Sequence, residues 1–353
     1  MAAASAALLS TVSTGPADAA PPVCAPNAGN TGLSAAVVAR AHQRIAHRTI
    51  HTSCDIGIYV GAGATGVTID HVTVSGAHFQ GIFADKTSHV TIVNSTVRNN
   101  GWHTFDLSQP PPGGMVPSDV SQAFGISLFG VSDSVVRGNR IYDNGRGGIG
   151  IMDNGPNNPG ARISHQNRAA PLVASSNDEI INNRMWANYN GCGLVAATQN
   201  LAGRLANLLL AGNTVTGTGI SPTGGPDIGG IVVAADPPNS TVHNVFVVHN
   251  TVSKSFEGGL IVNAEAPGSS TRNVWISGNH VTANNTGHLE APNTAGIIVN
   301  AAAPGAENLN TWIVQNQISK QFYGIWSQGS TRPVTLFNHI RVTPGGTPIY
   351  HQS

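Results

Sequence analysis

A two-part pattern of apolar and polar positions recurs along the last two thirds of the chain. An apolar run typical of a strand, such as 274–277, is followed by Asn, one variable residue and an aliphatic residue. In most repeats, a Gly with two to four apolar residues then follows, as at 296–299. The Asn of the first part occurs at Asn139, Asn183, Asn213, Asn250, Asn279, Asn316 and Asn338. A unit repeated in this way predicts stacked coils of short strands rather than one globular core.

The recurrent Asn has two properties that suit a bend between strands. Asn tolerates the left-handed backbone conformation that a sharp turn requires. Its amide both donates and accepts, so Asn side chains on successive coils can bond to one another and satisfy buried polar groups. We therefore expect Asn213, Asn250, Asn279 and Asn316 to stack in register along one edge, with the Asn itself forming the bend.

The spacing of the repeats gives the size of a coil. Residues 67–74 are nearly copied at 90–97, and successive Asn positions lie 22 to 44 residues apart. The base coil is therefore about 22–23 residues, with insertions where the spacing is larger. One group of insertions precedes the Gly-Ile strands, at 98–123, 217–228 and 283–294. The other group follows those strands, at 153–177, 198–207, 235–244, 264–273 and 301–310.

On these residues, the chain resembles the right-handed parallel β-helix families over about 57–342. These include pectate lyases, other secreted polysaccharide-active enzymes, and the periplasmic β-helix proteins of nitrous-oxide reductase maturation. The resemblance implies an all-β, single-stranded right-handed parallel β-helix of about nine coils. It also implies a substrate groove along the Gly-Ile strands. Because unrelated functions share this scaffold, the fold does not decide the activity.

The expected organisation has four parts. Residues 1–20 are Ala-rich and end in an A-x-A-like cleavage pattern, which predicts a signal peptide and a secreted or cell-surface protein. No basic residue precedes Arg40, so a start further upstream or a disordered cytosolic leader is the alternative. Residues 21–56 form an N-terminal cap with a helix over 33–46, 57–342 the β-helix, and 343–353 a C-terminal tail.

Cys24 and Cys54 flank the expected capping helix. A disulfide between them would hold that helix over the open end of the first coil, and export would favour it. The alternative is two unpaired, small apolar side chains. The third cysteine, Cys192, is expected to be a buried core residue.

The charge balance excludes several partners. Lys+Arg and Asp+Glu number 17 each, and charged residues make up 10% of the chain. A neutral chain lacks the basic surface that nucleic acid requires, and no apolar run is long enough for membrane insertion. We expect one elongated domain, a monomer, whose partner is a polysaccharide or another extended ligand.

The outward positions of the Gly-Ile strands are mostly apolar. They are Phe83, Ser127, Gly150, Val195, Val232, Ile261, Ile298 and Trp326. No Asp cluster accompanies them, so the calcium site of pectate lyases does not carry over, and the paired Asp with Gly-His-Gly typical of polygalacturonases is missing. The 14 His show no paired spacing on one strand, so neither a metal nor a cofactor is predicted.

Reactive side chains gather in the insertions at 98–123 and 153–177. Asp153 is the candidate base or nucleophile, and His165, His103 and Asp106 are candidates for proton transfer. The candidate substrate-binding residues are Trp102, Arg162, Arg168, Phe83 and Trp326. Each has a structural alternative: polar loop residues cap turns in solvated loops, and Phe83 and Trp326 pack beneath a loop.

Two functional classes fit these features. The first is a secreted carbohydrate-active enzyme, a lyase, hydrolase or epimerase that acts on a polysaccharide in the Gly-Ile groove. The alternative is a non-catalytic cell-surface or binding scaffold, or an isomerase or cyclase for an apolar ligand. The resemblance favours the first class, whereas the apolar groove floor favours the second.

Overall fold

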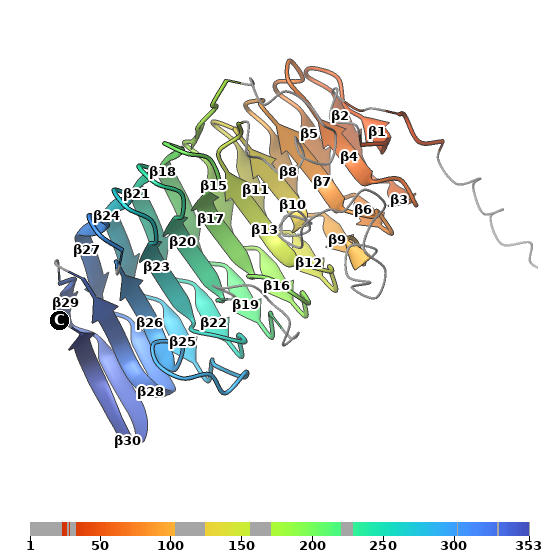
Figure 1. The fold of residues 1–353 in the computed structure, drawn as a ribbon. Coiled ribbons are helices and arrows are strands. Elements are labelled where there is room, and N and C mark those ends of the chain that lie inside the picture. The colour runs from red at the N-terminus through yellow and green to blue at the C-terminus, as the bar shows by residue number, and fades with distance from the viewer. Residues whose placement is uncertain are drawn as a thin grey trace, which may run out of the picture.

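The chain folds into a solenoid of short parallel strands (Figure 1). The computed structural model describes residues 23–26, 28, 33–102, 124–155, 171–219, 229–301, 303–329 and 332–352. Each coil contributes strands to three faces, and each strand pairs with its equivalents on the coils before and after. The predicted all-β parallel β-helix is therefore confirmed. Among the described residues, no helix is long and apolar enough to cross a membrane.

The three faces are named by their position relative to the recurrent Asn. The pre-Asn sheet contains β2 (Arg44–Ala46), β5 (Thr68–Asp70), β8 (Thr91–Val93), β11 (Val135–Arg137), β14 (Ser175–Ser176), β15 (Glu179–Ile181), β18 (Arg204–Ala211), β21 (Thr241–Val248), β24 (Ser270–Ser277), β27 (Glu307–Val314) and β29 (Val334–Leu336). The post-Asn sheet contains β3 (Thr49–His51), β6 (Thr73–Ser75), β9 (Thr96–Arg98), β12 (Arg140–Tyr142), β16 (Arg184–Trp186), β19 (Thr214–Thr216), β22 (Thr251–Ser253) and β25 (His280–Thr282).

The third face is the Gly-Ile sheet, which the last two strands join after crossing the post-Asn face. It contains β1 (Ala35–Val38), β4 (Ile56–Val60), β7 (Gln80–Asp85), β10 (Phe124–Phe129), β13 (Gly147–Met152), β17 (Leu194–Thr198), β20 (Ile231–Ala235), β23 (Leu260–Ala264), β26 (Ala295–Asn300), β28 (Gln317–Gln328) and β30 (His339–Gln352). Inward Ile, Val and Leu side chains of all three faces form one continuous core.

The stack is slightly longer than the sequence indicates. Ten pre-Asn strands follow one another from β2 to β29, so the described residues form ten coils rather than about nine. Strand β1 pairs with β4, and β30 pairs with β28 as far as Gln352. Paired strands therefore occur on both sides of the expected 57–342 range.

The helix expected over 33–46 is wrong. This stretch forms β1 and β2, which belong to the first coil. His42 and His47 have φ of 59° and 51°, values that end a helix and make turns between strands. Pairing with β4 and β5 also gives this backbone hydrogen-bond partners that an isolated helix would lack. The predicted disulfide is present, with the Cα atoms of Cys24 and Cys54 5.6 Å apart.

The Asn ladder is confirmed. From Asn139 to Asn316, each Asn Nδ2 donates to Oδ1 of the Asn on the next coil, at 2.9–3.1 Å. The same Oδ1 also accepts the backbone N–H of the preceding coil's Asn. Ser95 extends this column, because its N–H donates to Oδ1 of Asn139. The ladder thus satisfies both backbone and side-chain groups inside the bend.

The assignment of the left-handed residue to the ladder Asn is wrong. The residue before each ladder Asn is left-handed instead, and these residues are Gly138, Asn182, Gly212, His249, Gly278, Gln315 and Phe337. The ladder Asn must direct its side chain into the coil, whereas the residue before it makes the bend at the surface. A second column of Asn in the pre-Asn sheet does adopt the left-handed conformation, between β14 and β15 and in the middle of β18, β21, β24 and β27: Asn177, Asn207, Asn244, Asn273 and Asn310.

A buried carboxyl lies in a second column of inward polar side chains, where Ser134 and Asp178 occupy equivalent positions on successive coils. Asp178 is fully buried; its Oδ1 accepts the Ser134 N–H at 3.0 Å, and its Oδ2 has no partner. Burial raises the pKa of Asp178 to about 8. The folded protein therefore keeps a proton that the unfolded chain releases near pH 4. The contribution of Asp178 to stability is therefore highest below about pH 4 and falls as the pH rises from about 4 to about 8.

Replacing Asp178 by Asn should remove this pH dependence while it keeps the Oδ1 acceptor for Ser134. We expect a gain of about 2–5 kcal/mol in unfolding free energy at pH 8 and little gain at pH 4. Urea denaturation of both proteins at the two pH values measures the difference. An equal effect at both pH values would mean that Asp178 is ionised in the folded protein.

Candidate functional site

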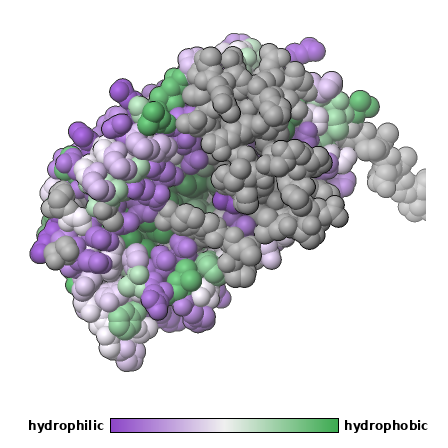
Figure 2. Space-filling view, viewed as in Figure 1, coloured by the Kyte–Doolittle hydropathy of each residue, from purple (hydrophilic) through white to green (hydrophobic). Residues whose placement is uncertain are grey.

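The outward row of the Gly-Ile sheet is as the sequence predicts, but its side chains are buried. Phe83, Ser127, Gly150, Val195, Val232, Ile261, Ile298 and Trp326 face one another in register. Most of them belong to a second apolar cluster outside the solenoid core. Figure 2 shows hydrophobic residues in a hollow between hydrophilic rims. Phe83 and Trp326 are each only 2% exposed, which fits packing better than contact with a sugar.

One polar network lies within this apolar face, at the ends of β4, β7 and β13. The Tyr59 hydroxyl donates to Asp85 Oδ2 at 3.0 Å, and the Asn154 amide donates to Asp85 Oδ1. All three side chains are buried. Burial raises the pKa of both Asp85 and Tyr59. A buried Tyr–carboxyl pair can hold and transfer a proton, and perturbed groups of this kind concentrate at functional sites.

Asp153 lies beside this network but points toward the next coil. Its Oδ1 accepts the Gln199 N–H at 2.5 Å, and its Oδ2 accepts the Asn200 amide at 2.7 Å. Burial raises the pKa of Asp153 to about 6. The side chain is fully buried, so it anchors the turn after β17. The candidates His103, Asp106, Arg162, His165 and Arg168 lie outside the described residues.

Trp102, the remaining candidate, belongs to a partly exposed group that the sequence analysis missed. Tyr142 and Trp186 occupy equivalent positions of β12 and β16, and their rings stack with centroids 4.2 Å apart. Trp102, 41% exposed, donates its indole N–H to the Asp143 carbonyl and lies 5.3 Å from the Tyr189 ring. Four aromatic side chains thus cover adjacent coils of the post-Asn face.

Three arginines surround these rings. Arg98 is in register with Tyr142, and Arg140 is in register with Arg184. The guanidinium carbons of Arg140 and Arg184 lie 5.7 and 5.1 Å from the Trp186 ring centroid. Within the described part of the chain, none of the three forms an ion pair. We call these seven residues the Arg–aromatic patch: Arg98, Trp102, Arg140, Tyr142, Arg184, Trp186 and Tyr189.

A second row of aromatic side chains lies on the pre-Asn sheet. Phe246, Trp275 and Trp312 are in register, and the two indoles stack 5.1 Å apart. Phe246 and Trp275 border a shallow groove of about 470 Å³ together with surface Asn residues. This row has aromatic surface without a group of arginines, which makes it a natural control for the Arg–aromatic patch.

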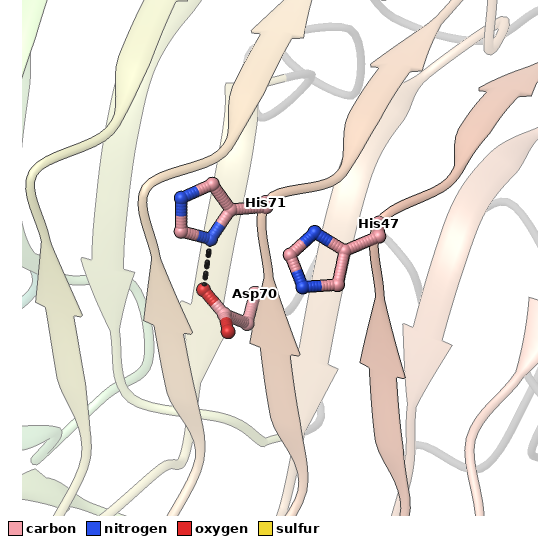
Figure 3. Close-up of side chains that lie close together, drawn as sticks. All are labelled: His47, Asp70 and His71. Carbon is pink, nitrogen blue, oxygen red and sulfur yellow. Dashed lines mark hydrogen bonds and ion pairs between the residues drawn. The ribbon is translucent and has the colours of Figure 1, made fainter.

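One cluster within the described residues has the composition of a metal site. His47, Asp70 and His71 offer ligand atoms within 4.8 Å of one another, where β2 and β5 end and the turns of the first two coils begin (Figure 3). His47 and His71 are 24 residues apart in sequence, so a search for paired His on one strand does not find them. The coil period of 23–24 residues is the signal that finds it.

The family of the chain is shown by comparison of its sequence with family models. The model described as the right handed beta helix region matches residues 30–268. The chain belongs to this family. The parallel stack of the structure is thus the right-handed β-helix that the sequence resembles. A comparison with curated protein sequences finds no match.

Two solved β-helix structures resemble this chain over most of its length. The A-module of the mannuronan C-5 epimerase AlgE6 of Azotobacter vinelandii is 16% identical, with a TM-score of 0.50. The match covers 87% of this β-helix chain and 72% of that one. PfbA, a surface adhesin of Streptococcus pneumoniae, is 14% identical, with a TM-score of 0.57 and coverage of 87% and 69%. At these identities the likeness concerns the fold alone.

Proposed function

We propose that this β-helix protein is secreted or displayed at the cell surface and binds an acidic polysaccharide through the Arg–aromatic patch. The observation that carries the proposal is the concentration of aromatic and arginine side chains in this patch. The chain has five Trp and five Tyr, and the patch holds two of each, together with three arginines. The similar structures are an enzyme named for mannuronan and a surface adhesin, and both are compatible with this role.

The chemistry of the patch fits a sugar acid better than a neutral sugar. Guanidinium groups bind carboxylates with two parallel hydrogen bonds, and aromatic rings supply apolar surface for a sugar ring. Coils stack at about 4.8 Å, so the three coils from β9 to β16 span roughly 10 Å along the axis. An extended chain of two or more sugar acids can therefore contact the rings and the arginines at once.

The proposal predicts a salt-sensitive interaction. Affinity electrophoresis of the protein in gels that contain polygalacturonate, alginate or neutral dextran should show retardation by the two acidic polymers only. The retardation should decrease at high salt because exposed charges are screened. Trp186→Ala and Arg184→Ala should each weaken binding by about tenfold or more, which is about 1.4 kcal/mol.

Trp275→Ala is the matched control, because Trp275 is also a partly exposed, stacked Trp on an outer sheet. It should leave the retardation unchanged, and all variants should melt near the wild-type temperature. Equal retardation of wild-type protein and Trp186→Ala would refute the proposal. Loss of binding in Trp275→Ala alone would assign the ligand to the aromatic row of the pre-Asn sheet, Phe246, Trp275 and Trp312.

A second candidate function is catalysis, which the Tyr59–Asp85–Asn154 network favours. It lies at the carboxyl ends of β4, β7 and β13, and Asn154 belongs to the insertion at 153–177, one of the two in which the sequence predicts chemistry. In this proposal Asp85 and Tyr59 exchange protons with a polysaccharide, while Asp153, Asp106, His103 and His165 stay the sequence-based candidates. The same polymers should then give unsaturated products absorbing at 235 nm, or new reducing ends. Asp85→Asn should abolish turnover without weakening retardation in the gel.

A further inference from the structure

The turns after β2 and β5 bring two histidines together on adjacent coils. Residues 44–46 pair with residues 68–70, so the next positions, His47 and His71, lie opposite each other. Their rings stack with centroids 5.2 Å apart and an interplanar angle of 25°. Both side chains are exposed. Figure 3 shows the two imidazoles on neighbouring turns with Asp70 beside them.

Asp70 completes the group as a carboxylate that is fixed in place. Its Oδ2 accepts a hydrogen bond from Arg44 at 2.7 Å, and its Oδ1 lies 2.6 Å from His71 Nδ1. The bonds from Arg44 and His71 lower the pKa of Asp70 to about 2, so it is ionised across the physiological range. Arg44 thus holds Oδ2 in place, and Oδ1 can bind a metal ion together with His71. Hydrogen-bonded carboxylates of this kind are common around metal ligands.

We propose that His47, Asp70 and His71 bind one divalent transition-metal ion, for which zinc is the best match. Two imidazoles and one carboxylate form a donor set that suits Zn²⁺, Ni²⁺ and Cu²⁺, whereas Ca²⁺ prefers oxygen ligands throughout. The three ligand atoms, within 4.8 Å of one another, must approach to about 3.3 Å, the separation set by tetrahedral bonds of about 2.0–2.1 Å. Rotation of exposed side chains provides this movement, and water fills the remaining position.

Coordination of the metal ion by His71 Nδ1 requires only a shift of the ring proton, and no other reactant is needed. The neutral ring has one proton, and coordination through Nδ1 moves that proton to Nε2. The bound ion would join the turns of the first and second coils. This inference does not depend on the proposed polysaccharide function.

The experiment uses untagged protein stripped with EDTA, because a polyhistidine tag would bind the same ions. Isothermal titration with ZnCl₂ at pH 7.5 should give one site per chain, and Zn²⁺ should raise the melting temperature whereas Ca²⁺ should not. His47→Ala, Asp70→Asn and His71→Ala should each weaken binding by about tenfold or more. His42→Ala and His89→Ala are matched controls, since both residues are left-handed and exposed, His42 on the first coil and His89 on the third.

Three outcomes would overturn the proposal: no stoichiometric binding to wild-type protein, undiminished binding to a His47→Ala/His71→Ala double variant, or an equal loss in the His42 and His89 controls. Because the four His side chains belong to exposed turns and Asp70 ends strand β5 at the surface, circular dichroism should show the wild-type fold in each variant. A shift of the melting temperature by Zn²⁺ in wild-type protein, absent from His47→Ala, would support a site that connects the two coils.

Discussion

Replacing Asn250 by Leu should destabilise the protein by about 3 kcal/mol or more. Asn250 Oδ1 accepts the backbone N–H of Asn213 at 2.8 Å and its Nδ2 at 3.1 Å, and Asn250 Nδ2 donates to the Leu210 carbonyl at 2.8 Å. Leu cannot replace any of these bonds, and each buried polar group left without a partner costs about 1–3 kcal/mol. Urea denaturation measures the loss, and hydrogen exchange of the Asn213 amide should be the most accelerated.

The second Asn column provides the control for this experiment. Asn244 also bonds to its neighbours through amides, with Nδ2 2.9 Å from Asn207 Oδ1, but it lies at the surface and is left-handed. Asn244→Gly keeps the backbone conformation and lets water replace the lost bonds, so its effect should stay within about 0.5 kcal/mol. Equal losses in the two variants would mean that burial of the inner amides is not the source of the stability.

Removal of the Cys24–Cys54 disulfide should have an effect of similar size. The bond closes a loop with a sequence separation of 30, and the chain-entropy account assigns such a loop about 3–4 kcal/mol. A Cys24→Ser/Cys54→Ser variant should lose this amount in urea denaturation. The variant and the wild type should become equally stable in dithiothreitol, because Cys24–Cys54 is the disulfide that the reductant breaks. Unchanged stability of the variant without reductant would contradict the prediction.

The parts of the fold that repeat could be predicted from the sequence. A ladder Asn makes the same bonds on every coil, so the sequence repeats it in the same context, as at Asn250 and Asn279. The first coil has no such marker. Its apolar residues 33–46 also fit a helix, and only pairing with β4 and β5 makes them strands. Tertiary pairing thus overrides the local pattern where the repeat is weakest.

The candidate sites depend on neighbours one coil apart, which linear motifs do not reveal. Tyr59 and Asp85 are 26 residues apart in sequence, and nothing local to either residue indicates the contact. The Arg–aromatic patch did leave a signal, because Asn139-Arg-Ile-Tyr and Asn183-Arg-Met-Trp align at the ladder position. Once the ladder fixes the register, Tyr142 and Trp186 must be neighbours. The burial of Phe83 and Trp326 had no signal, since an outward position is apolar whether it is covered or exposed.

The ladder also bears on how such a chain changes during evolution. Asn213, Asn250 and Asn279 make equivalent bonds, although the residues between them differ in number. A duplication or deletion that starts at one ladder position and ends at another therefore joins equivalent backbone points and leaves every amide with a partner. Whole coils can be gained or lost without a change of register. The length of the molecule is thus open to selection separately from the chemistry of its surface.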